Sequence, residues 1–523
     1  MKSIPPANDR PTTTTESMAS VYIETFGCQM NEADSRYIAE RASSAGYTIA
    51  GRPEEANVLV LNTCTVRDNA ERRAYGRMNH FKALKDADPA LKLVVMGCLA
   101  EQDRDRMRQA APHVDAIFGT SELVRLGDTL REWSASFEHT ELSEERALVF
   151  PLGGAADCVT DGFSHLRGYV TVQRGCSYYC TFCIVPHVRG RFDHRPMGDV
   201  LAEARERIAE GAREITLVGQ TVNAYEDPAT GEDFGDLCKA VAALPGLERM
   251  TFISPHPKDF TEKIVRDLSG VPQLNPRMHL PLQSGSDRVL RRMNRKYTME
   301  QFRERVAAIH RYLPQWAITT DIIVGFPGES EADFQATLEV VAEAGYDSAF
   351  TFVFSPRPGT KAAEMEGDFV PIEVVAERFE RLKVVAERSA LARHRARIGK
   401  VEEALVEGSS KKDERLLTGR TRQGKLVHFV PAHSSFDTGD GVAAGDTVSA
   451  GDTVSVGDTV SAGGTVAAGD FVKVRIDSAA PHHLLGTLLS VESPGRRRKA
   501  PVPVSTTVGR PVRIPVHIPV RVS

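Results

Sequence analysis

Cys176-Ser-Tyr-Tyr-Cys180-Thr-Phe-Cys183 places three thiols within eight residues, shortly after the apolar run 168–172. Thiolates are the ligands that iron–sulfur clusters require. Four thiolates close a cluster, whereas three leave one iron open to another molecule, so the loop is more typical of a reactive centre than of an electron carrier. The alternatives are chance or a zinc loop completed by His187, but the spacing is not that of a zinc finger. The stretch predicts an iron–sulfur cluster at the end of a strand.

From this loop onward, strand-like and helix-like segments alternate about six times. Repeated βα units imply a parallel sheet with helices outside, either doubly wound or curled into a complete or partial barrel. Ligands bind beyond the carboxyl ends of such strands, and polar or small residues follow four of them. The predicted strands are 169–173, 214–218, 249–254, 278–282, 319–324 and 349–354, and the polar loops are 219–223, 254–257, 283–286 and 325–329. Facing the cysteine loop, they predict a pocket.

Three further cysteines lie upstream, and each follows a short apolar run rich in β-branched residues. Cys28, Cys64 and Cys98 end the runs 21–26, 57–61 and 91–96, with helix-like stretches between them. Such runs read as parallel strands, so their carboxyl ends meet at one edge of a sheet. A buried structural cysteine is the alternative for any one of the three. Together they predict a second three-thiolate site, whereas Cys158 and Cys238 have no partner at ligand spacing.

The composition is that of an ordinary globular protein with two or three domains. The 523 residues are 41% apolar and 26% charged, and no apolar run has the length of a membrane span. The first twenty residues resemble neither a secretory signal nor a transit peptide. Eight cysteines in so long a chain do not make a disulfide scaffold, which favours a reducing cytoplasm.

The C-terminal part differs in charge and pattern from the rest. From Arg393 onward there are 19 Lys and Arg against 13 Asp and Glu, although the whole chain has a net charge of −5. A long charged helix over 371–398 precedes short alternating runs that predict a small antiparallel β barrel. Its basic residues favour a nucleic-acid-binding module over a protein-interaction barrel. They include Lys411, Lys412, Arg415, Arg420 and Arg422.

These patterns divide the chain into six segments. They are a disordered lead (1–19), an α/β domain (20–138), a linker (139–161), a βα-repeat domain (162–398), a β barrel (399–492) and a disordered basic, proline-rich tail (493–523). A Gly-Asp-Thr-Val-type repeat with a period of six residues is inserted in the barrel near 437–470. Four copies barely suffice to share a core, so a loop that grew by duplication is the simpler interpretation.

Several of these stretches resemble the radical S-adenosylmethionine methylthiotransferases. The spacing of Cys176, Cys180 and Cys183 resembles the radical S-adenosylmethionine signature, and the wider strings 174–191, 279–287 and 321–329 resemble the methylthiotransferase subgroup. Thr25-Phe-Gly-Cys-Gln-Met-Asn31 and Asn62-Thr-Cys-Thr-Val-Arg67 are similar to its MiaB-type tRNA enzymes. The barrel is similar to the family's TRAM domain, and the resemblance spans roughly 22–490. Thr65 and Thr221 depart from the family's commoner serine and asparagine.

The resemblance implies a fold, a reaction and a set of site residues. The fold would be an α/β parallel-sheet domain, a partial (βα)6 barrel and a TRAM-like barrel. Cys176, Cys180 and Cys183 would hold a radical-generating [4Fe-4S] cluster, and Cys28, Cys64 and Cys98 an auxiliary [4Fe-4S] cluster. S-adenosylmethionine would contact Gln220, Asn223, Gln283, Ser284, Gly285 and Asp321.

The implied reaction is methylthiolation at C2 of N6-isopentenyladenosine at tRNA position 37, next to the anticodon. The expected partners are the tRNA anticodon stem-loop, a flavodoxin-type electron donor and a sulfur source, for a cytoplasmic monomer without a membrane contact. One alternative is a sister enzyme that modifies threonylcarbamoyl-adenosine or a ribosomal protein. Another is a two-cluster electron-transfer or cluster-carrier protein.

Overall fold

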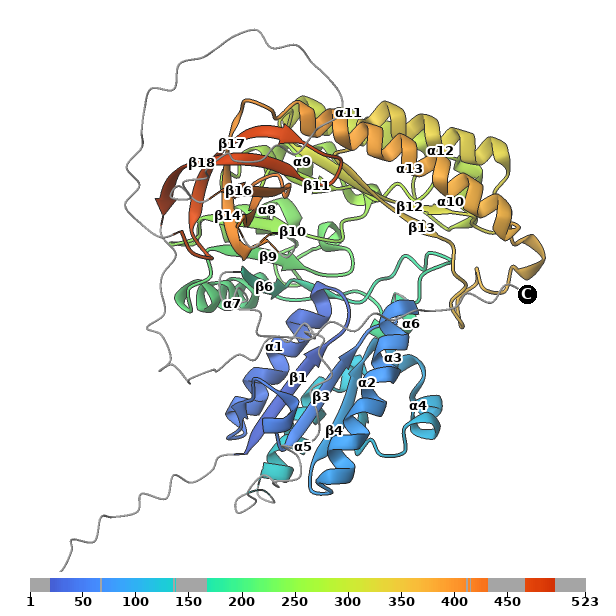
Figure 1. Cartoon of the computed structure of the whole chain (residues 1–523). Coiled ribbons are helices and arrows are strands. Elements are labelled where there is room, and N and C mark those ends of the chain that lie inside the picture. The colour runs from blue at the N-terminus through green and yellow to red at the C-terminus, as the bar shows by residue number, and fades with distance from the viewer. Residues whose placement is uncertain are drawn as a thin grey trace, which may run out of the picture.

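Three packed units follow one another along the chain in the computed structural model (Figure 1). The structure describes residues 19–65, 68–134, 137, 167–410, 413, 415–430 and 466–493. The lead up to residue 18, the linker, most of the Gly-Asp insert, the tail beyond 493, Lys411, Lys412 and Cys158 lie outside the described residues. In Figure 1 the N-terminal unit (blue) lies below the central unit (green to yellow), with the last unit (orange to red) at the upper left.

The N-terminal unit is a parallel five-stranded sheet with helices on both faces. The strand order is β2-β1-β3-β4-β5, and all six residues of β3 are buried, as a central strand covered on both faces requires. The strands are β1 (Ser20–Thr25), β2 (Thr48–Ile49), β3 (Val58–Thr63), β4 (Lys92–Gly97) and β5 (Ala116–Phe118). The helices are α1 (Gln29–Ser44), α2 (Asp68–Ala87), α3 (Cys98–Gln102), α4 (Arg104–Ala110) and α5 (Leu123–Ser134). The predicted parallel α/β unit is confirmed.

The central unit contains six parallel strands in two sheets of three. One sheet has the order β10-β9-β6 and the other β11-β12-β13, and a bridge between Met250 and Leu274 joins them. The strands are β6 (Arg167–Thr171), β9 (Glu214–Val218), β10 (Arg249–Phe252), β11 (Arg277–His279), β12 (Ala317–Val324) and β13 (Ser348–Val353). Of the folds that the sequence allowed, a doubly wound sheet or a complete or partial barrel, the structure has the partial barrel.

Helices cover the outer side of this half-barrel (Figure 1). They are α7 (Met197–Ala209), α8 (Phe234–Ala242), α9 (Glu262–Ser269), α10 (Asp287–Arg292), α11 (Met299–Tyr312), α12 (Glu331–Ala344) and α13 (Ile372–Arg395), whereas α6 (Val185–Arg189) lies at the contact with the N-terminal unit. The Thr298 hydroxyl accepts from the Gln301 amide at 3.3 Å and the Gln301 side chain accepts from the Thr298 amide at 3.0 Å, which begins α11 with a capping box. A short hairpin of β7 (Gln173–Arg174) and β8 (Asp193–His194) flanks the cysteine loop.

The last unit is a closed five-stranded barrel. Its strands are β14 (Val401–Ser409), β15 (Leu417–Thr421), β16 (Leu426–Val430), β17 (Phe471–Ala479) and β18 (Leu484–Ser493). The expectation of a wholly antiparallel barrel is wrong at one pair, because β16 and β18 run parallel. An odd number of strands cannot alternate in direction around a closed ring, so one parallel pair is unavoidable.

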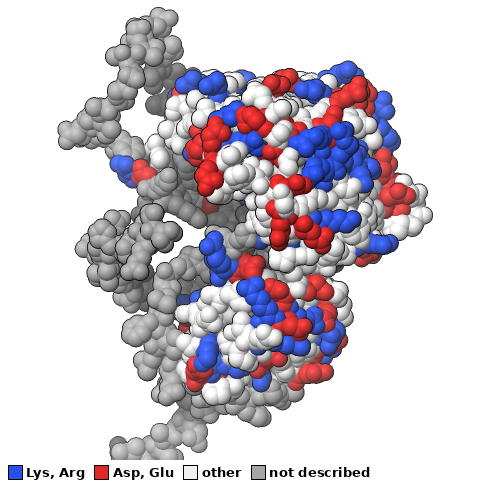
Figure 2. Space-filling model, turned by 90° about the vertical axis from the view of Figure 1, so that its right-hand side faces the viewer, with Lys and Arg blue, Asp and Glu red and all other residues white. Residues whose placement is uncertain are grey.

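Ion pairs and aromatic contacts fix this barrel to the central unit. Lys425 of the barrel lies 2.5 Å from the Asp347 carboxylate, and both side chains are buried. The guanidinium groups of Arg213 and Arg249 each lie 4.1 Å from the centre of the Phe471 ring. The face in Figure 2 carries Lys and Arg side chains mixed with Asp and Glu, so neither sign covers it uniformly. None of the described helices has the length and apolarity needed to cross a membrane.

Candidate metal centre

The cysteine loop leaves the central sheet at one conformationally demanding residue. Gly175 has φ +69°, and a Cβ there would lie 1.9 Å from the Arg191 carbonyl oxygen, so only glycine fits. The buried Gln173 side chain donates to the Gly175 carbonyl and accepts from the Thr221 amide at 3.1 Å. This amide therefore ties the cysteine loop to the loop after β9. Cys176, Cys180 and Cys183 are half-buried free thiols on the loop that results.

Two polar groups from other loops reach the sulfurs of this trio. The Thr221 hydroxyl lies 3.5 Å from the Cys176 sulfur, and Arg295 Nη1 donates to the Cys180 sulfur at 3.5 Å. Burial raises the pKa of Cys183 to about 12 and also raises the pKa of Cys176. These thiols are therefore neutral on their own at neutral pH, and a bound cation would supply the charge that releases their protons.

The second trio comes from three neighbouring strand ends of the N-terminal sheet. Thr25 pairs with Asn62 and Thr63 pairs with Gly97, so Cys28, Cys64 and Cys98 follow β1, β3 and β4 at one edge. A Cβ at Gly27 would lie 2.8 Å from the Cβ of Cys64, and one at Gly97 2.3 Å from the Thr63 carbonyl oxygen. Burial raises the pKa of the Cys98 thiol to about 12, with the nearby Cys64 and Cys28 as lesser causes in the same direction. The structure thus brings these thiols together.

A buried asparagine pair links the first two of these cysteine loops. Asn31 Nδ2 donates to Asn62 Oδ1 at 3.0 Å, and Asn62 Nδ2 donates to the Asn31 carbonyl at 2.8 Å. Asn31 Oδ1 also accepts from the Cys28 thiol at 3.5 Å. Both asparagines are fully buried. Sequence reasoning quoted these residues in motifs but gave them no role, because nothing in their types indicates that two loops 31 residues apart are paired.

The sulfur spacing tests what either trio can hold. A tetrahedral zinc site, with Zn–S bonds of about 2.3 Å, separates its sulfurs by ~3.8 Å. Among the described residues, the one group of three Cys, His, Asp or Glu ligand atoms lying within 4.8 Å of one another is Asp233, Asp236 and Asp267, whose carboxylates pair with Lys239 and Lys263. Within the described residues, neither trio has its three sulfurs all within 4.8 Å of one another, so the side chains as placed do not form a compact single-zinc site.

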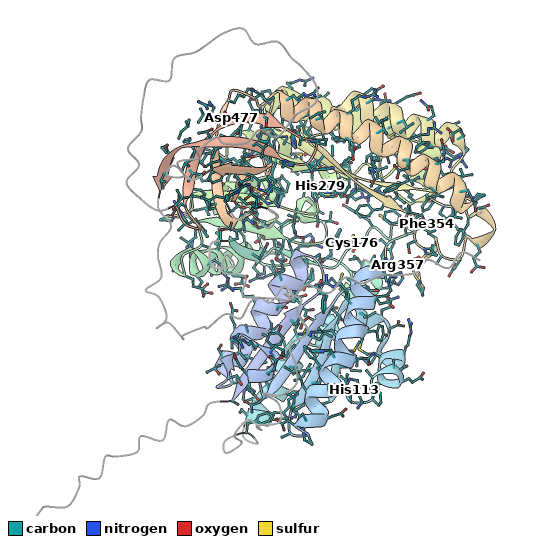
Figure 3. The ribbon with its side chains drawn as sticks, viewed as in Figure 1. His113, Cys176, His279, Phe354, Arg357 and Asp477 are labelled. Carbon is teal, nitrogen blue, oxygen red and sulfur yellow. The ribbon has the colours of Figure 1, made fainter. Side chains whose placement is uncertain are left out.

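The two trios face each other across the contact between the first two units. Cys98, at the start of α3, packs in one buried apolar cluster with Ile184 and Val188. Ile184 directly follows Cys183, and Val188 lies on α6, which packs against α3. In Figure 3, Cys176 lies at the side of the central unit nearest the N-terminal unit. The thiols therefore belong to one region built from two domains.

Some of the residues predicted to contact S-adenosylmethionine have side chains that are already hydrogen-bonded within the protein, and others do not. Gln220 keeps its buried side-chain oxygen without a hydrogen-bond partner, and Gln283, four residues after the end of β11, stands at φ +65°. Asn223 Nδ2 donates to the His256 carbonyl at 2.9 Å, and Asn223 Oδ1 accepts from the His256 amide at 2.7 Å. The Ser284 hydroxyl accepts from the Ser286 amide at 3.3 Å. An unpartnered buried oxygen makes Gln220 the best-placed ligand contact of the set.

Gly285 packs against a helix instead of facing open space. A Cβ there would lie 2.5 Å from the Thr337 Cα and 2.6 Å from the Ala336 carbonyl oxygen, both backbone atoms of α12. We expect Gly285→Ala to lower the free energy of unfolding by about 2 kcal/mol, because this backbone cannot move aside cheaply. Gly198→Ala on α7 is the matched control, since a Cβ there meets no atom within 4 Å. Equal denaturation midpoints for the two variants would contradict the packing role.

The inner face of the second sheet carries a polar pair beside exposed aromatic rings. His279 Nε2 lies 3.2 Å from Asp321 Oδ2, and the rings of His279 and Phe350 are 6.2 Å apart. Asp321 pairs with Phe350 and Ile323 with Phe352 across β12 and β13, so these residues share one face. Phe350 is 53% exposed and Phe352 39%. Figure 3 shows His279 within the central unit, above Cys176 in that view. Sequence reasoning missed this patch, because an edge strand of alternating aromatic residues looks like ordinary core.

The predicted RNA-binding residues of the barrel occupy different positions. Arg420 donates to Glu407 within the barrel at 3.1 Å and its side chain is 42% exposed, whereas Arg422 donates to the Pro272 carbonyl of the central unit at 2.8 Å. Arg415 is exposed and bonds Asp413 at 2.8 Å. Lys411 and Lys412 lie outside the described residues. Of the three described residues, Arg415 and Arg420 have exposed side chains and Arg422 is bonded to the central unit.

Comparisons with known proteins agree on one relationship. A family model described as "Uncharacterized protein family UPF0004" matches residues 20–119, and the "Radical SAM superfamily" model matches residues 170–341. A tRNA-2-methylthio-N(6)-dimethylallyladenosine synthase of Parafrankia sp. is 46% identical over 419 residues, covering 79% of this chain and 83% of that protein. The protein of the same name from Mycolicibacterium smegmatis is 39% identical over 500 residues, covering 94% and 90%.

Among solved structures, the chain is similar to the radical S-adenosylmethionine methyltransferase TsrM from Kitasatospora setae. The TM-score is 0.47 at 13% identity, with 66% of this chain and 74% of that chain covered. This likeness is weaker than the relationship in sequence and adds nothing to it.

Proposed function

The chain belongs to the tRNA-2-methylthio-N6-dimethylallyladenosine synthases of the radical S-adenosylmethionine superfamily, and we propose that its two cysteine trios hold the two clusters of that reaction. The enzyme class and the methylthiolation of tRNA predicted from the sequence are confirmed by these relatives, at 39–46% identity over most of the chain. S-adenosylmethionine and a [4Fe-4S] cluster follow from the superfamily. The individual ligands and the second cluster are proposals.

We propose that Cys176, Cys180 and Cys183 hold the radical-generating cluster. Bound there, the cluster and S-adenosylmethionine supply the radical chemistry that removes hydrogen from an unreactive carbon, and a second S-adenosylmethionine supplies the methyl group. Three thiols leave a coordination position for that cofactor. The unpartnered Gln220 oxygen is an acceptor for its amino group, and Arg295 places positive charge beside Cys180.

We propose that Cys28, Cys64 and Cys98 hold an auxiliary [4Fe-4S] cluster that supplies or relays the sulfur. The observation that carries this proposal is the packing of Cys98 against Ile184 and Val188, which follow the other cysteine loop directly. Sulfur held at Cys28, Cys64 and Cys98 is thereby kept next to the place where the radical forms. Ile184 and Val188 exclude water from the side of this trio at Cys98, as a reactive centre requires.

The test of the substrate is mass spectrometry of tRNA nucleosides from a strain that lacks this gene. We expect 2-methylthio-N6-dimethylallyladenosine to disappear, its unthiolated precursor to accumulate, and the chain to restore the product. Loss of a threonylcarbamoyl-adenosine derivative, or of a ribosomal-protein modification, would identify a sister enzyme instead. Release of no 5′-deoxyadenosine from S-adenosylmethionine would favour an electron-transfer or cluster-carrier protein.

We further propose that Phe350 and Phe352 hold the target base or its isopentenyl group. Their exposed rings share the inner face of the half-barrel with His279 and Asp321, and a base in a single-stranded loop stacks on such rings. We expect Phe350→Ala/Phe352→Ala to lower kcat/KM for tRNA about tenfold, since stacking contributes about 1–3 kcal/mol per base. Uncoupled S-adenosylmethionine cleavage should persist.

The matched control for this pair is Ile372→Ala, at the start of α13, whose side chain is 66% exposed. It should leave kcat/KM for tRNA unchanged. A double phenylalanine variant with the wild-type kcat/KM would contradict this assignment without affecting the reaction assigned to the chain.

The remaining partners are proposals from the sequence alone. They are a flavodoxin-type electron donor, a separate sulfur source, and a monomer in the cytoplasm that binds the anticodon stem-loop. Arg415 is the described basic residue of the barrel best exposed for that contact. Sedimentation of the protein with and without a stem-loop tests the monomer and the binding together.

A further inference from the structure

Arg189 connects the two cysteine trios through a single side chain. It ends α6, six residues after Cys183, and its side chain is 5% exposed. Its Nε donates to the Cys98 sulfur at 3.2 Å, and its Nη2 donates to Asp34 Oδ2 at 2.9 Å. Arg189 thus belongs to the radical S-adenosylmethionine domain, and its guanidinium bonds a thiol of the N-terminal domain.

The surroundings of this guanidinium give the site a net positive charge. Asp34 lies on α1 and is 2% exposed, and its other oxygen accepts from Arg174 Nη1 at 3.0 Å. Among the described residues, two guanidinium groups and one carboxylate leave a net positive charge of about one, shared between the buried Arg189 and Arg174, which is 31% exposed. A buried charge of this kind needs an anionic partner, because desolvation penalises an unpaired ion. A thiolate at Cys98 is such a partner.

The direction of the Nε–H bond distinguishes Arg189 from Arg174. Both arginines bond Asp34 across the domain contact, but Arg189 also reaches a cysteine sulfur. The other trio has an arginine with the same role, since Arg295 donates to the Cys180 sulfur. Arg295, however, comes from the same domain as the sulfur that it bonds. Among the described residues, Arg189 is the arginine that lies in the domain of one trio and bonds a cysteine of the other trio.

We propose that Arg189 is a positioning residue that raises the reduction potential of the auxiliary cluster by hydrogen bonding to its Cys98 ligand. Reduction adds negative charge to a cluster, and hydrogen bonds and positive charge at the sulfurs stabilise the reduced form. The same bond holds the Cys98 loop to the segment that follows Cys183. This inference rests on the proposed auxiliary cluster at Cys28, Cys64 and Cys98.

The experiment isolates that cluster in the full-length chain. Cys176→Ala/Cys180→Ala/Cys183→Ala serves as the background, so that the titrated iron belongs to the other trio. An anaerobic redox titration followed by electron paramagnetic resonance then gives the midpoint potential. In this background, Arg189→Met should lower the ratio of reduced to oxidised cluster about tenfold at a fixed solution potential, a shift of about 59 mV for one electron.

Two further variants separate an electrostatic role from a structural one. Asp34→Asn removes the negative charge and leaves Arg189 bonded to Cys98, so the potential should rise. Arg174→Met removes an ion pair to the same carboxylate without touching Cys98, so its shift should be much smaller than that of Arg189→Met. Shifts of the same sign in Arg189→Met and Asp34→Asn, or equal shifts in the two arginine variants, would overturn the inference and indicate a clamp between domains.

Iron content tells this failure apart from failure of the proposed function. A background protein that reconstitutes about four irons per chain supports the auxiliary cluster, whatever the potentials are. A background protein without a cluster would overturn both the auxiliary cluster and the role of Arg189. If Arg189→Met does not fold, Asp34→Asn and Arg189→Lys still decide, because a potential that does not rise in the first and does not fall in the second contradicts the proposal.

Discussion

Replacing Cys176, Cys180 and Cys183 together by alanine is expected to abolish release of 5′-deoxyadenosine from S-adenosylmethionine. The iron content after anaerobic reconstitution should fall from about eight to about four per chain, because one of two four-iron clusters is lost. No side chain can replace the radical chemistry that this cofactor supplies, so we expect the rate to fall at least about 10³-fold. Chromatography of the nucleoside products and an iron assay measure the two effects.

The matched control is Cys238→Ala. Cys238 is a buried cysteine of α8 within the apolar core of the central unit. Its replacement should cost stability through a small cavity but leave the iron content and the 5′-deoxyadenosine yield unchanged. Retention of about eight irons by the triple alanine variant would remove the radical S-adenosylmethionine cluster from this loop.

The sequence was informative where local pattern determines structure. Short β-branched runs such as 57–61 are recognisable as buried parallel strands, and the ends of adjacent parallel strands meet at one sheet edge. The convergence of Cys28, Cys64 and Cys98 follows from that rule. The two-residue strand β2 and the three-residue strand β5 are too short to show a period, and both were missed.

Local sequence pattern did not predict the contacts between segments that are distant in the chain. Nothing in the sequence relates Arg189 to Cys98, 91 residues earlier, or pairs Asn31 with Asn62. The basic residue Arg422 looked available for RNA, yet it bonds the Pro272 carbonyl of the central unit. Composition indicates which charges a segment carries, but the packing of one domain on another decides which of them remain exposed.

Gly285 shows the same limit at a single residue. The resemblance to the family implied a cofactor contact for this loop, and that role stays a prediction. The missing Cβ of Gly285 also admits the backbone of α12, a contact that the sequence did not indicate. The loop after β11 therefore packs against α12 at Gly285, two residues after Gln283, which has φ +65°.

Cys98→Ala is expected to separate the two halves of the reaction. The thiols of the other loop are untouched, so S-adenosylmethionine cleavage should continue, whereas methylthiolated tRNA should fall at least about 10²-fold because the auxiliary cluster has lost one of three ligands. The ratio of 5′-deoxyadenosine to methylthiolated nucleoside, both measured by mass spectrometry, reports the separation. An intact Cys98→Ala protein that makes the product at the wild-type rate would exclude Cys98 as a cluster ligand.

Cys98→Ser distinguishes the loss of a ligand from the loss of a packing contact. Serine keeps the size of the side chain and an oxygen that accepts from Arg189, but it is a poorer ligand for iron than a thiolate. If Cys98 acts as a ligand, Cys98→Ser should lose the product nearly as fully as Cys98→Ala, with 5′-deoxyadenosine still formed. If Cys98 only packs α3 against α6, Cys98→Ser should restore product formation while Cys98→Ala does not. The ligand role therefore requires the two variants to agree, even though only one of them removes the bond to Arg189.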